Sequence, residues 1–229
     1  MKRSTIILVG SGTVGKTTLA QRLKYKTFTP GGLTMTDGIE MSHLRIGDID
    51  TLLLDFAGQK DYVHTHAIFF KKSAIYIAVF MPRSSGTFLE LENYLQMIKD
   101  CSPHAPIILV TTRSDESVLS KEEIDQIMYQ HSRILAVCPV DCKTGTGILD
   151  LEILLEKIIL QQPDTVRKVP TVFFKFEELL SQFALEGRFS LSAEEFLRTG
   201  IDQFKLKIEA VELAKDLFSS VSMYLRSHF

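Results

Sequence analysis

The chain lacks three features that would narrow its class at once: a long hydrophobic run, a strong net charge and a cysteine framework. Its longest apolar stretches, such as residues 74–81, are far shorter than the roughly 20 residues needed to span a bilayer. Its formal net charge of -2 creates no global field that would attract nucleic acid or anionic lipid. We therefore expect no transmembrane segment and no nucleic-acid partner, and any binding site must be argued from local residues.

The cysteines point to a reducing environment. Cys101, Cys138 and Cys142 are odd in number and form no C-x-x-C pair. Because we also expect no secretory leader ahead of the first apolar run, we predict a cytoplasmic location.

Short apolar runs rich in Ile, Val and Leu recur along the first two thirds of the chain, and helix-like segments separate most of them. This alternation is typical of a parallel sheet covered on both faces. Residues 39–56 depart from it, because Gly47-Asp48 suggests a hairpin turn. We predict an α/β fold with a mostly parallel six-stranded sheet, one antiparallel edge strand and helices on both faces. The other runs are residues 5–9, 51–56, 74–80, 106–112 and 133–140.

A change of composition divides the chain. A helical segment over 148–160 ends in the stretch QQPDTVRKVP, whose prolines and polar residues mark a linker. We predict a nucleotide-binding domain over residues 1–162, a linker over 163–170 and a small, mainly helical unit over 171–229. Within the last unit, residues 173–183 and 204–225 carry apolar side chains at helical spacing.

The strongest motif follows the first apolar run and fits G-x-x-x-x-G-K-[ST], the P-loop of nucleotide-binding proteins. Its glycines let backbone N–H groups curl around phosphate oxygens, and the following helix adds its positive end. In this geometry Lys16 reaches the β- and γ-phosphates, and Thr17 ligates magnesium. The alternative is a glycine turn that only caps a helix, and the motif alone does not separate ATP from GTP. The residues expected to cradle phosphate are Gly10, Ser11, Gly12, Thr13, Val14, Gly15, Lys16, Thr17 and Thr18.

A second element, Asp55-Phe-Ala-Gly58-Gln59, closes a later apolar run. There Asp55 is expected to hold magnesium through water, and Gly58 to bring its N–H to the γ-phosphate. Gln59 is the candidate for orienting the attacking water. An acidic loop followed by a turn is the simpler interpretation of this element taken alone.

Two further elements suit a guanine base. In TTRSD, Thr112, Arg113 and Asp115 are candidate nucleotide-binding residues. The Asp115 carboxylate is placed to accept hydrogen bonds from N1–H and the exocyclic amine of guanine, a donor pair that adenine lacks. A helix-capping aspartate is the alternative. In VDCKTGTG, the backbone N–H groups of Cys142 and Lys143 are expected to meet the guanine O6, and the Lys143 stem to cover the base.

These four elements, in this order, resemble the motif set of Ras-like small GTPases over residues 1–162. The stretch DFAGQKDYVHTHAIFFKKSAIYIAVF is most similar to the Roc domain of Roco proteins, the group that includes the leucine-rich-repeat kinases. The region after Pro170 is similar to the beginning of the COR domain that follows Roc. The resemblance also implies a magnesium-binding threonine in TPGGLTMTDGIE, where Thr34 and Thr36 are candidates and the Roc pattern favours Thr36.

Two positions depart from the family pattern. Arg113 stands where a lysine packs on the base, which predicts either guanidinium stacking on guanine or weaker nucleotide affinity. Asp141-Cys142-Lys143 replaces the commoner Ser-Ala-Lys and leaves the backbone contacts possible.

The sequence therefore predicts a guanine-nucleotide-binding switch that hydrolyses GTP to GDP slowly with Mg²⁺. Its protein effectors and regulators are not indicated, and a monomer that associates at most weakly is the default. A P-loop ATPase and a nucleotide-binding scaffold without significant hydrolysis are the alternatives.

Overall fold

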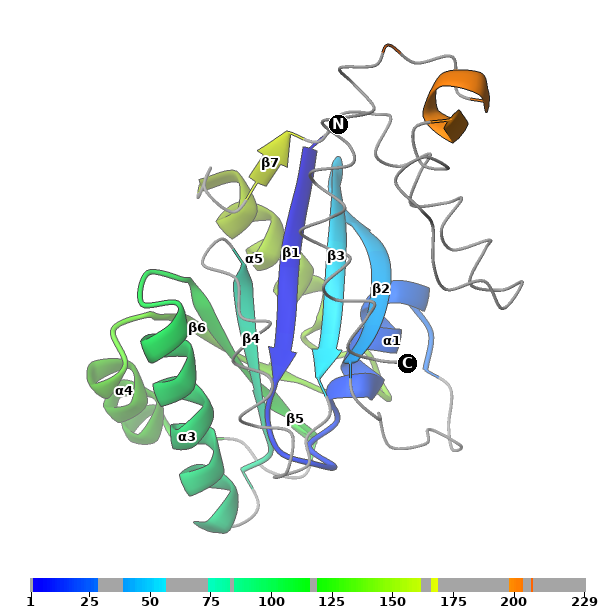
Figure 1. Cartoon of the computed structure of the whole chain (residues 1–229). Helices are drawn as coiled ribbons and strands as arrows, with labels where there is room; N and C mark the ends of the chain where they lie inside the picture. Colours follow the sequence, from blue (N-terminus) through cyan, green and yellow to red (C-terminus); the bar gives the residue numbers. More distant parts are fainter. Residues whose placement is uncertain are drawn as a thin grey trace. The chain divides into compact units, whose positions relative to one another are not determined.

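The computed structural model describes residues 2–28, 39–56, 74–82, 85–115, 119–161, 166–168, 198–203 and 207 (Figure 1). The chain divides into two units, one of residues 2–167 and one of residues 168–229 together with Met1, and this division falls within the predicted linker. In the second unit the described structure is the π-helix η4 (Thr199–Gln203). Apart from Lys207, the two predicted helical segments lie outside the described residues.

A mostly parallel sheet forms the centre of the first unit. Its strands are β1 (Lys2–Val9), β2 (Ile39–Ile46), β3 (Ile49–Phe56), β4 (Ile75–Phe80), β5 (Ile107–Thr112), β6 (Ile134–Val140) and β7 (Val166–Lys168). Six of them lie in the order β2-β3-β1-β4-β5-β6. Only β2 and β3 pair antiparallel along this order, and the other pairs are parallel. The predicted six-stranded sheet with one antiparallel edge strand is thus confirmed.

The edge strand arises from the predicted hairpin. Ile46 pairs with Ile49, so the turn consists of Gly47 and Asp48, and Gly47 has a φ of 54°. Such a left-handed turn suits glycine and matches the twist of the two strands.

The short strand β7 lies inside the predicted linker and pairs with β1. The register leaves room for it, because β4 pairs with β1 only along Ile6–Val9. The segment was predicted to be irregular because prolines flank it, and the three residues of β7 lie among the six between Pro163 and Pro170.

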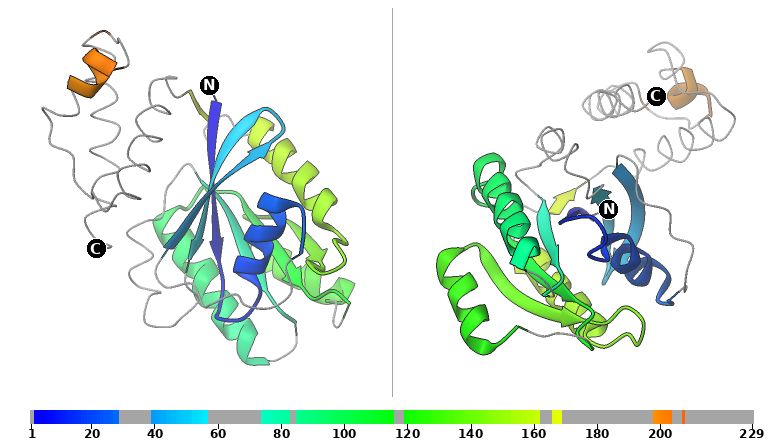
Figure 2. Two further views of the ribbon diagram at one scale, coloured as in Figure 1. Left: turned by 90° about the vertical axis from the view of Figure 1, so that its right-hand side faces the viewer. Right: turned by 90° about the horizontal axis from the view of Figure 1, so that it is seen from below.

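Helices cover both faces of the sheet, as predicted. They are α1 (Lys16–Tyr25), α3 (Ser85–Cys101), α4 (Lys121–Gln130) and α5 (Ile148–Gln161). Figure 2 shows α1 and α5 on one face, with α3 and α4 on the other. Buried side chains of α1 and α5, among them Leu19, Leu23, Leu151 and Leu155, join those of the strands in one hydrophobic core. Within the part of the chain that the structure describes, no helix is both long and apolar enough to cross a membrane.

Candidate nucleotide-binding site

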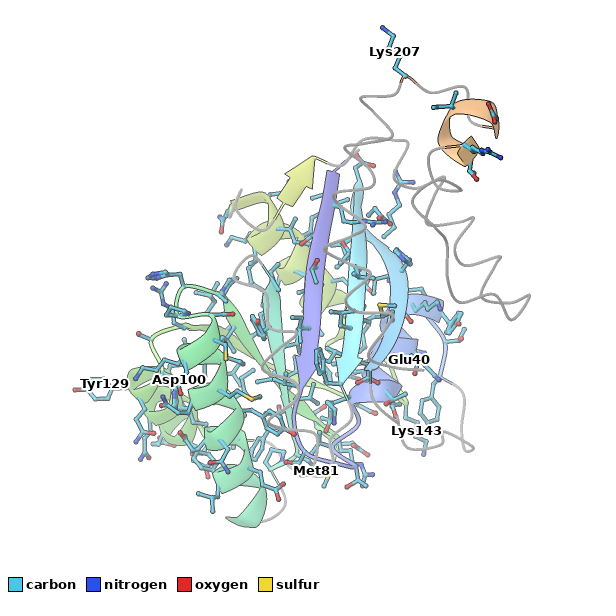
Figure 3. All side chains as sticks on the ribbon, viewed as in Figure 1. Glu40, Met81, Asp100, Tyr129, Lys143 and Lys207 are labelled. Atoms are coloured by element: carbon cyan, nitrogen blue, oxygen red, sulfur yellow. The ribbon has the colours of Figure 1, made fainter. Side chains whose placement is uncertain are left out.

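The described loops after β1, β5 and β6 and the end of β3 lie at the carboxyl ends of the parallel strands, and they carry most of the predicted site residues that the structure describes. In Figure 3 the labelled side chains of Met81 and Lys143 mark this lower edge, where the arrowheads of β1 and β3 end. Ligands of open α/β sheets bind at this edge.

The loop between β1 and α1 needs glycine at its first position. Gly10 has a φ of 143°, and a methyl group built on it would lie 2.2 Å from the backbone oxygen of Val79 in β4. Gly15 precedes α1 with a φ of 94° and provides no side-chain cap. The first N–H groups of α1 therefore have no capping side chain to satisfy them, which is the arrangement that binds phosphate at helix N-termini.

Lys16 is the buried charge of this loop. It is only 5% exposed, and its ammonium donates hydrogen bonds to the backbone oxygens of Gly10 (2.8 Å) and Ser11 (2.7 Å). Burial lowers the pKa of Lys16 from 10.5 to about 8, against the opposing effect of the nearby Asp55 carboxylate. A buried ammonium with a lowered pKa is a position that a bound anion would stabilise.

The structure brings together two residues predicted to serve magnesium. The Thr17 hydroxyl, on the first turn of α1, donates to Oδ2 of Asp55 at the end of β3 over 2.6 Å. Asp55 is only 2% exposed. Hydroxyl and carboxylate oxygens are the hard donors that Mg²⁺ prefers, so this pair fits the ion.

Thr17 and Asp55 are two ligands, fewer than an ion needs. No group of three or more His, Cys, Asp or Glu side chains among the described residues is placed to hold a metal ion. In nucleotide sites Mg²⁺ usually takes several of its ligands from water and phosphate, so two protein side chains are compatible with this ion.

Thr112 acts on the phosphate loop itself. Its buried hydroxyl donates to the backbone oxygen of Val14 over 2.6 Å and lies 3.4 Å from that of Phe80. Thr112 was predicted to bind nucleotide. In the structure it instead holds the loop that would bind the phosphates, through its hydrogen bond to Val14. A hydroxyl at the end of an otherwise apolar strand was the available signal.

The loops expected to read the base are joined by a backbone hydrogen bond. The N–H of Ser114 donates to the backbone oxygen of Val140 over 3.2 Å, so the loop after β5 and the loop after β6 lie side by side. Arg113 is exposed and has a φ of 54°, and Asp115 is exposed as well. The predicted base-reading residues therefore face accessible space at the strand ends.

Asp141 organises the loop after β6, a role that the sequence analysis missed. Its carboxylate, 6% exposed, accepts the N–H groups of Lys143 (2.8 Å) and Thr144 (3.2 Å) and the Thr144 hydroxyl (2.5 Å). Burial raises the pKa of Asp141, but these hydrogen bonds outweigh it, so the pKa is lowered overall. The Asp-x-x-Thr spacing, typical of turns closed by an aspartate side chain, was the signal for it.

This turn changes the expected guanine contact. The Lys143 N–H, predicted to meet O6, already donates to Asp141. Cys142 is buried within the same turn, and the contact of its backbone N–H with O6 stays a prediction. Four residues named in the sequence analysis, Thr34, Thr36, Gly58 and Gln59, lie outside the described residues.

The chain matches one family model, that of "Roc: Ras of Complex, Roc, domain of DAPkinase", over residues 5–115. The match ends at Asp115, the predicted base-reading carboxylate, and includes the segments after β1 and β3 and the first three residues after β5.

Several known proteins are similar to this chain. It is 28% identical over 206 residues to the probable serine/threonine-protein kinase pats1 of Dictyostelium discoideum, covering 77% of this chain and 6% of the kinase. It is 26% identical to the Ras-related protein Rab-32D of the same organism, covering 70% of this chain and 75% of that protein. The chain thus spans a small part of the Roco kinase and most of the Ras-related protein.

A solved structure shares the fold. The structure of Methanosarcina barkeri Roco2 RocCORdC bound to GDP matches with a TM-score of 0.63 and 25% identity, covering 78% of this chain and 55% of that one. The sheet order, the phosphate loop and these similarities agree with one another. The chain therefore contains a Ras-like Roc domain of the kind that Roco proteins carry.

Proposed function

We propose that this protein is a guanine-nucleotide switch that binds GTP and hydrolyses it to GDP and phosphate in a magnesium-dependent P-loop site. The observation that carries the proposal is the buried Lys16 ammonium at the uncapped start of α1. A cation that has lost most of its water and lies at a helix N-terminus without a side-chain cap is matched to a polyphosphate.

The phosphate subsite uses the backbone of residues 10–18. The N–H groups of the loop and of the first turn of α1 hold phosphate oxygens, while Lys16 exchanges its two backbone acceptors for the β- and γ-phosphates. Thr17 and Asp55 hold Mg²⁺, together with Thr36 under the same proposal. When bound, the ion neutralises charge that develops on the β- and γ-oxygens.

The base subsite uses the adjoining loops. Asp115 accepts from N1–H and the exocyclic amine of guanine, and the N–H of Cys142 donates to O6. Lys143 and Arg113, both exposed, cover the base from the two loops. Arg113 replaces lysine here, and its planar guanidinium stacks on an aromatic face as an ammonium does not.

For hydrolysis, Gln59 orients the attacking water and the N–H of Gly58 meets the γ-phosphate. We expect slow turnover, on the order of 10⁻⁴ to 10⁻² per second, because no arginine is assigned to the transition-state charge. Residues 171–229 form the beginning of a COR-like unit in this proposal, and the chain is a cytoplasmic monomer whose effectors are proteins.

The test is competition binding of GDP, GTP, ATP and XTP to the purified chain with magnesium, followed by chromatography of the bound nucleotide over several hours. We expect guanine preference and slow conversion of GTP to GDP. Guanine binding without conversion would instead indicate a nucleotide-binding scaffold, for which the exposed Arg113 is the supporting feature. Equal competition by ATP would indicate an ATPase and contradict the assignment of Asp115.

A variant makes the base assignment specific. Asp115→Asn exchanges an acceptor for an amide that can donate to the second carbonyl of xanthine, so the preference should move from GDP towards XDP. The exposed Asp125 of α4 provides a matched control, because Asp125→Asn removes the same charge away from the site. An unchanged GDP preference in Asp115→Asn would show that Asp115 does not read the base.

A further inference from the structure

Arg22 of α1 lies against Gly145 in the loop that follows β6. Gly145 in that loop has a φ of 90°, and a methyl group built on it would lie 2.3 Å from Nη2 and 3.4 Å from Cζ of Arg22. The guanidinium of Arg22 therefore lies directly against the one face of Gly145 where any other residue would carry its side chain.

Gly145 is where the loop closes. Its N–H donates to the backbone oxygen of Asp141 over 2.8 Å, and its own oxygen accepts the N–H of Ile148, the first residue of α5, over 3.2 Å. A group that presses on Gly145 therefore acts on the whole turn. Cys142 and Lys143 lie inside that turn, between its two ends.

The helix that carries Arg22 also begins the phosphate subsite. Arg22 follows Lys16 by six residues, about 9 Å along the helix axis. Buried Leu19 and Leu23 fix α1 on the sheet, and an ion pair between Lys26 and Glu152 joins its end to α5. The start of α1 and the contact at Gly145 therefore belong to one fixed element.

We propose that Arg22 is a positioning residue, which holds the turn over residues 141–147 so that the Cys142 N–H points to the O6 of guanine. This inference rests on the proposed function. Two further observations support it. The Arg22 charge is close enough to lower the pKa of the Cys142 thiol, although burial and Asp141 raise it to about 11 overall. The distances also increase from Nη2 (2.3 Å) to Cζ (3.4 Å) and Nε (3.7 Å), so the tip of the guanidinium points at Gly145.

Three nucleotides allow the two base contacts to be tested independently. IDP lacks the exocyclic amine and tests Asp115, whereas 6-thio-GDP keeps both donors and replaces O6 by sulfur, a weaker acceptor, and so tests Cys142. The experiment measures the dissociation constants of GDP, IDP and 6-thio-GDP, with ADP as the reference for guanine preference, for the full chain and for Arg22→Ala, Arg22→Lys and Lys24→Ala. Lys24 is the matched control, an exposed cation of the same helix that lies 4.9 Å from the ring centre of Tyr25.

For Arg22→Ala we expect the preference for GDP over 6-thio-GDP to fall about threefold to tenfold, the effect of one misplaced hydrogen bond. The preference for GDP over IDP should stay unchanged, because Asp115 is on another loop. Arg22→Lys should restore part of the lost preference, and Lys24→Ala should equal the wild type. Thermal unfolding shows which variants fold. If Arg22→Ala does not fold, the comparison of Arg22→Lys with the wild type tests the inference.

Two results would overturn the inference, and they are distinguishable. In the first, the wild type prefers GDP to 6-thio-GDP and the Arg22 variants keep the same preference. This result would show that Arg22 only fills space. A proportional loss of affinity for all three nucleotides would indicate general destabilisation with the same consequence. If the wild type does not prefer GDP to ADP, the proposed function itself fails, and the inference fails with it.

Discussion

The buried ammonium of Lys16 should destabilise the empty protein. Burial lowers its pKa from 10.5 to about 8, and this difference corresponds to about 3 kcal/mol of unfavourable free energy in the charged folded state. Between these two pH values the unfolded chain binds more protons than the folded one, so stability rises with pH. The cost is fully present below pH 8 and is relieved as the pH approaches 10.5.

The comparison is between nucleotide-free wild type and Lys16→Met, unfolded in urea at several pH values. All other titrating groups are shared, so the difference between the two free energies of unfolding isolates Lys16. We expect the wild type to gain about 2 kcal/mol relative to Lys16→Met between pH 7 and about 9.5. With GDP bound, the phosphates should keep Lys16 charged and the gain should disappear.

Two parallel stability curves would refute this reasoning. They would mean that the hydrogen bonds to Gly10 and Ser11 offset the burial of the charge completely. Lys24→Met serves as the control, since the exposed Lys24 should give no pH-dependent difference from the wild type.

Two other substitutions test the site at separate steps. Thr112→Val leaves the backbone oxygen of Val14 without this donor. We expect the free energy of unfolding in urea to fall by about 1–3 kcal/mol and GDP binding to weaken. Thr111→Val, at a buried neighbour on the same strand, should retain GDP affinity. Gln59→Leu removes the proposed water-orienting amide and should slow single-turnover GTP hydrolysis by about tenfold or more while GTP affinity is kept. Hydrolysis at the wild-type rate would remove Gln59 from the mechanism.

The sheet could be predicted from the sequence because most of its strands are short apolar runs with clear boundaries. The hairpin was predictable for the same reason, since Gly47 supplies a left-handed turn at the right distance from two alternating runs. The strand β7 was not, because a three-residue strand has no periodicity, and its pairing depends on the space that the short register between β1 and β4 leaves.

The site was predictable where a motif fixes both residue type and spacing. Lys16, Thr17 and Asp55 come together as expected, because their loops follow strands that end at one edge of the sheet. The roles of Thr112 and Asp141 were not predictable in detail. Thr112 satisfies a backbone oxygen of a neighbouring loop, and Asp141 satisfies backbone N–H groups of its own loop. Which backbone groups need a partner is decided by the tertiary structure.

The contacts described here organise what GDP and GTP have in common. Lys16 and the start of α1 suit phosphate, Asp115 and Cys142 suit the base, and hydrogen bonds of Thr112 and Ser114 connect the phosphate loop, β5 and β6. Under the proposed function these loops bind both nucleotides in one pose, so they do not by themselves distinguish GTP from GDP. Under the proposed function the difference between GTP and GDP must be sensed by Thr36, Gly58 and Gln59, the residues that would meet the γ-phosphate. Mutations should therefore separate the two properties. Changes in the phosphate and base loops should alter nucleotide affinity, and changes at these three residues should alter switching.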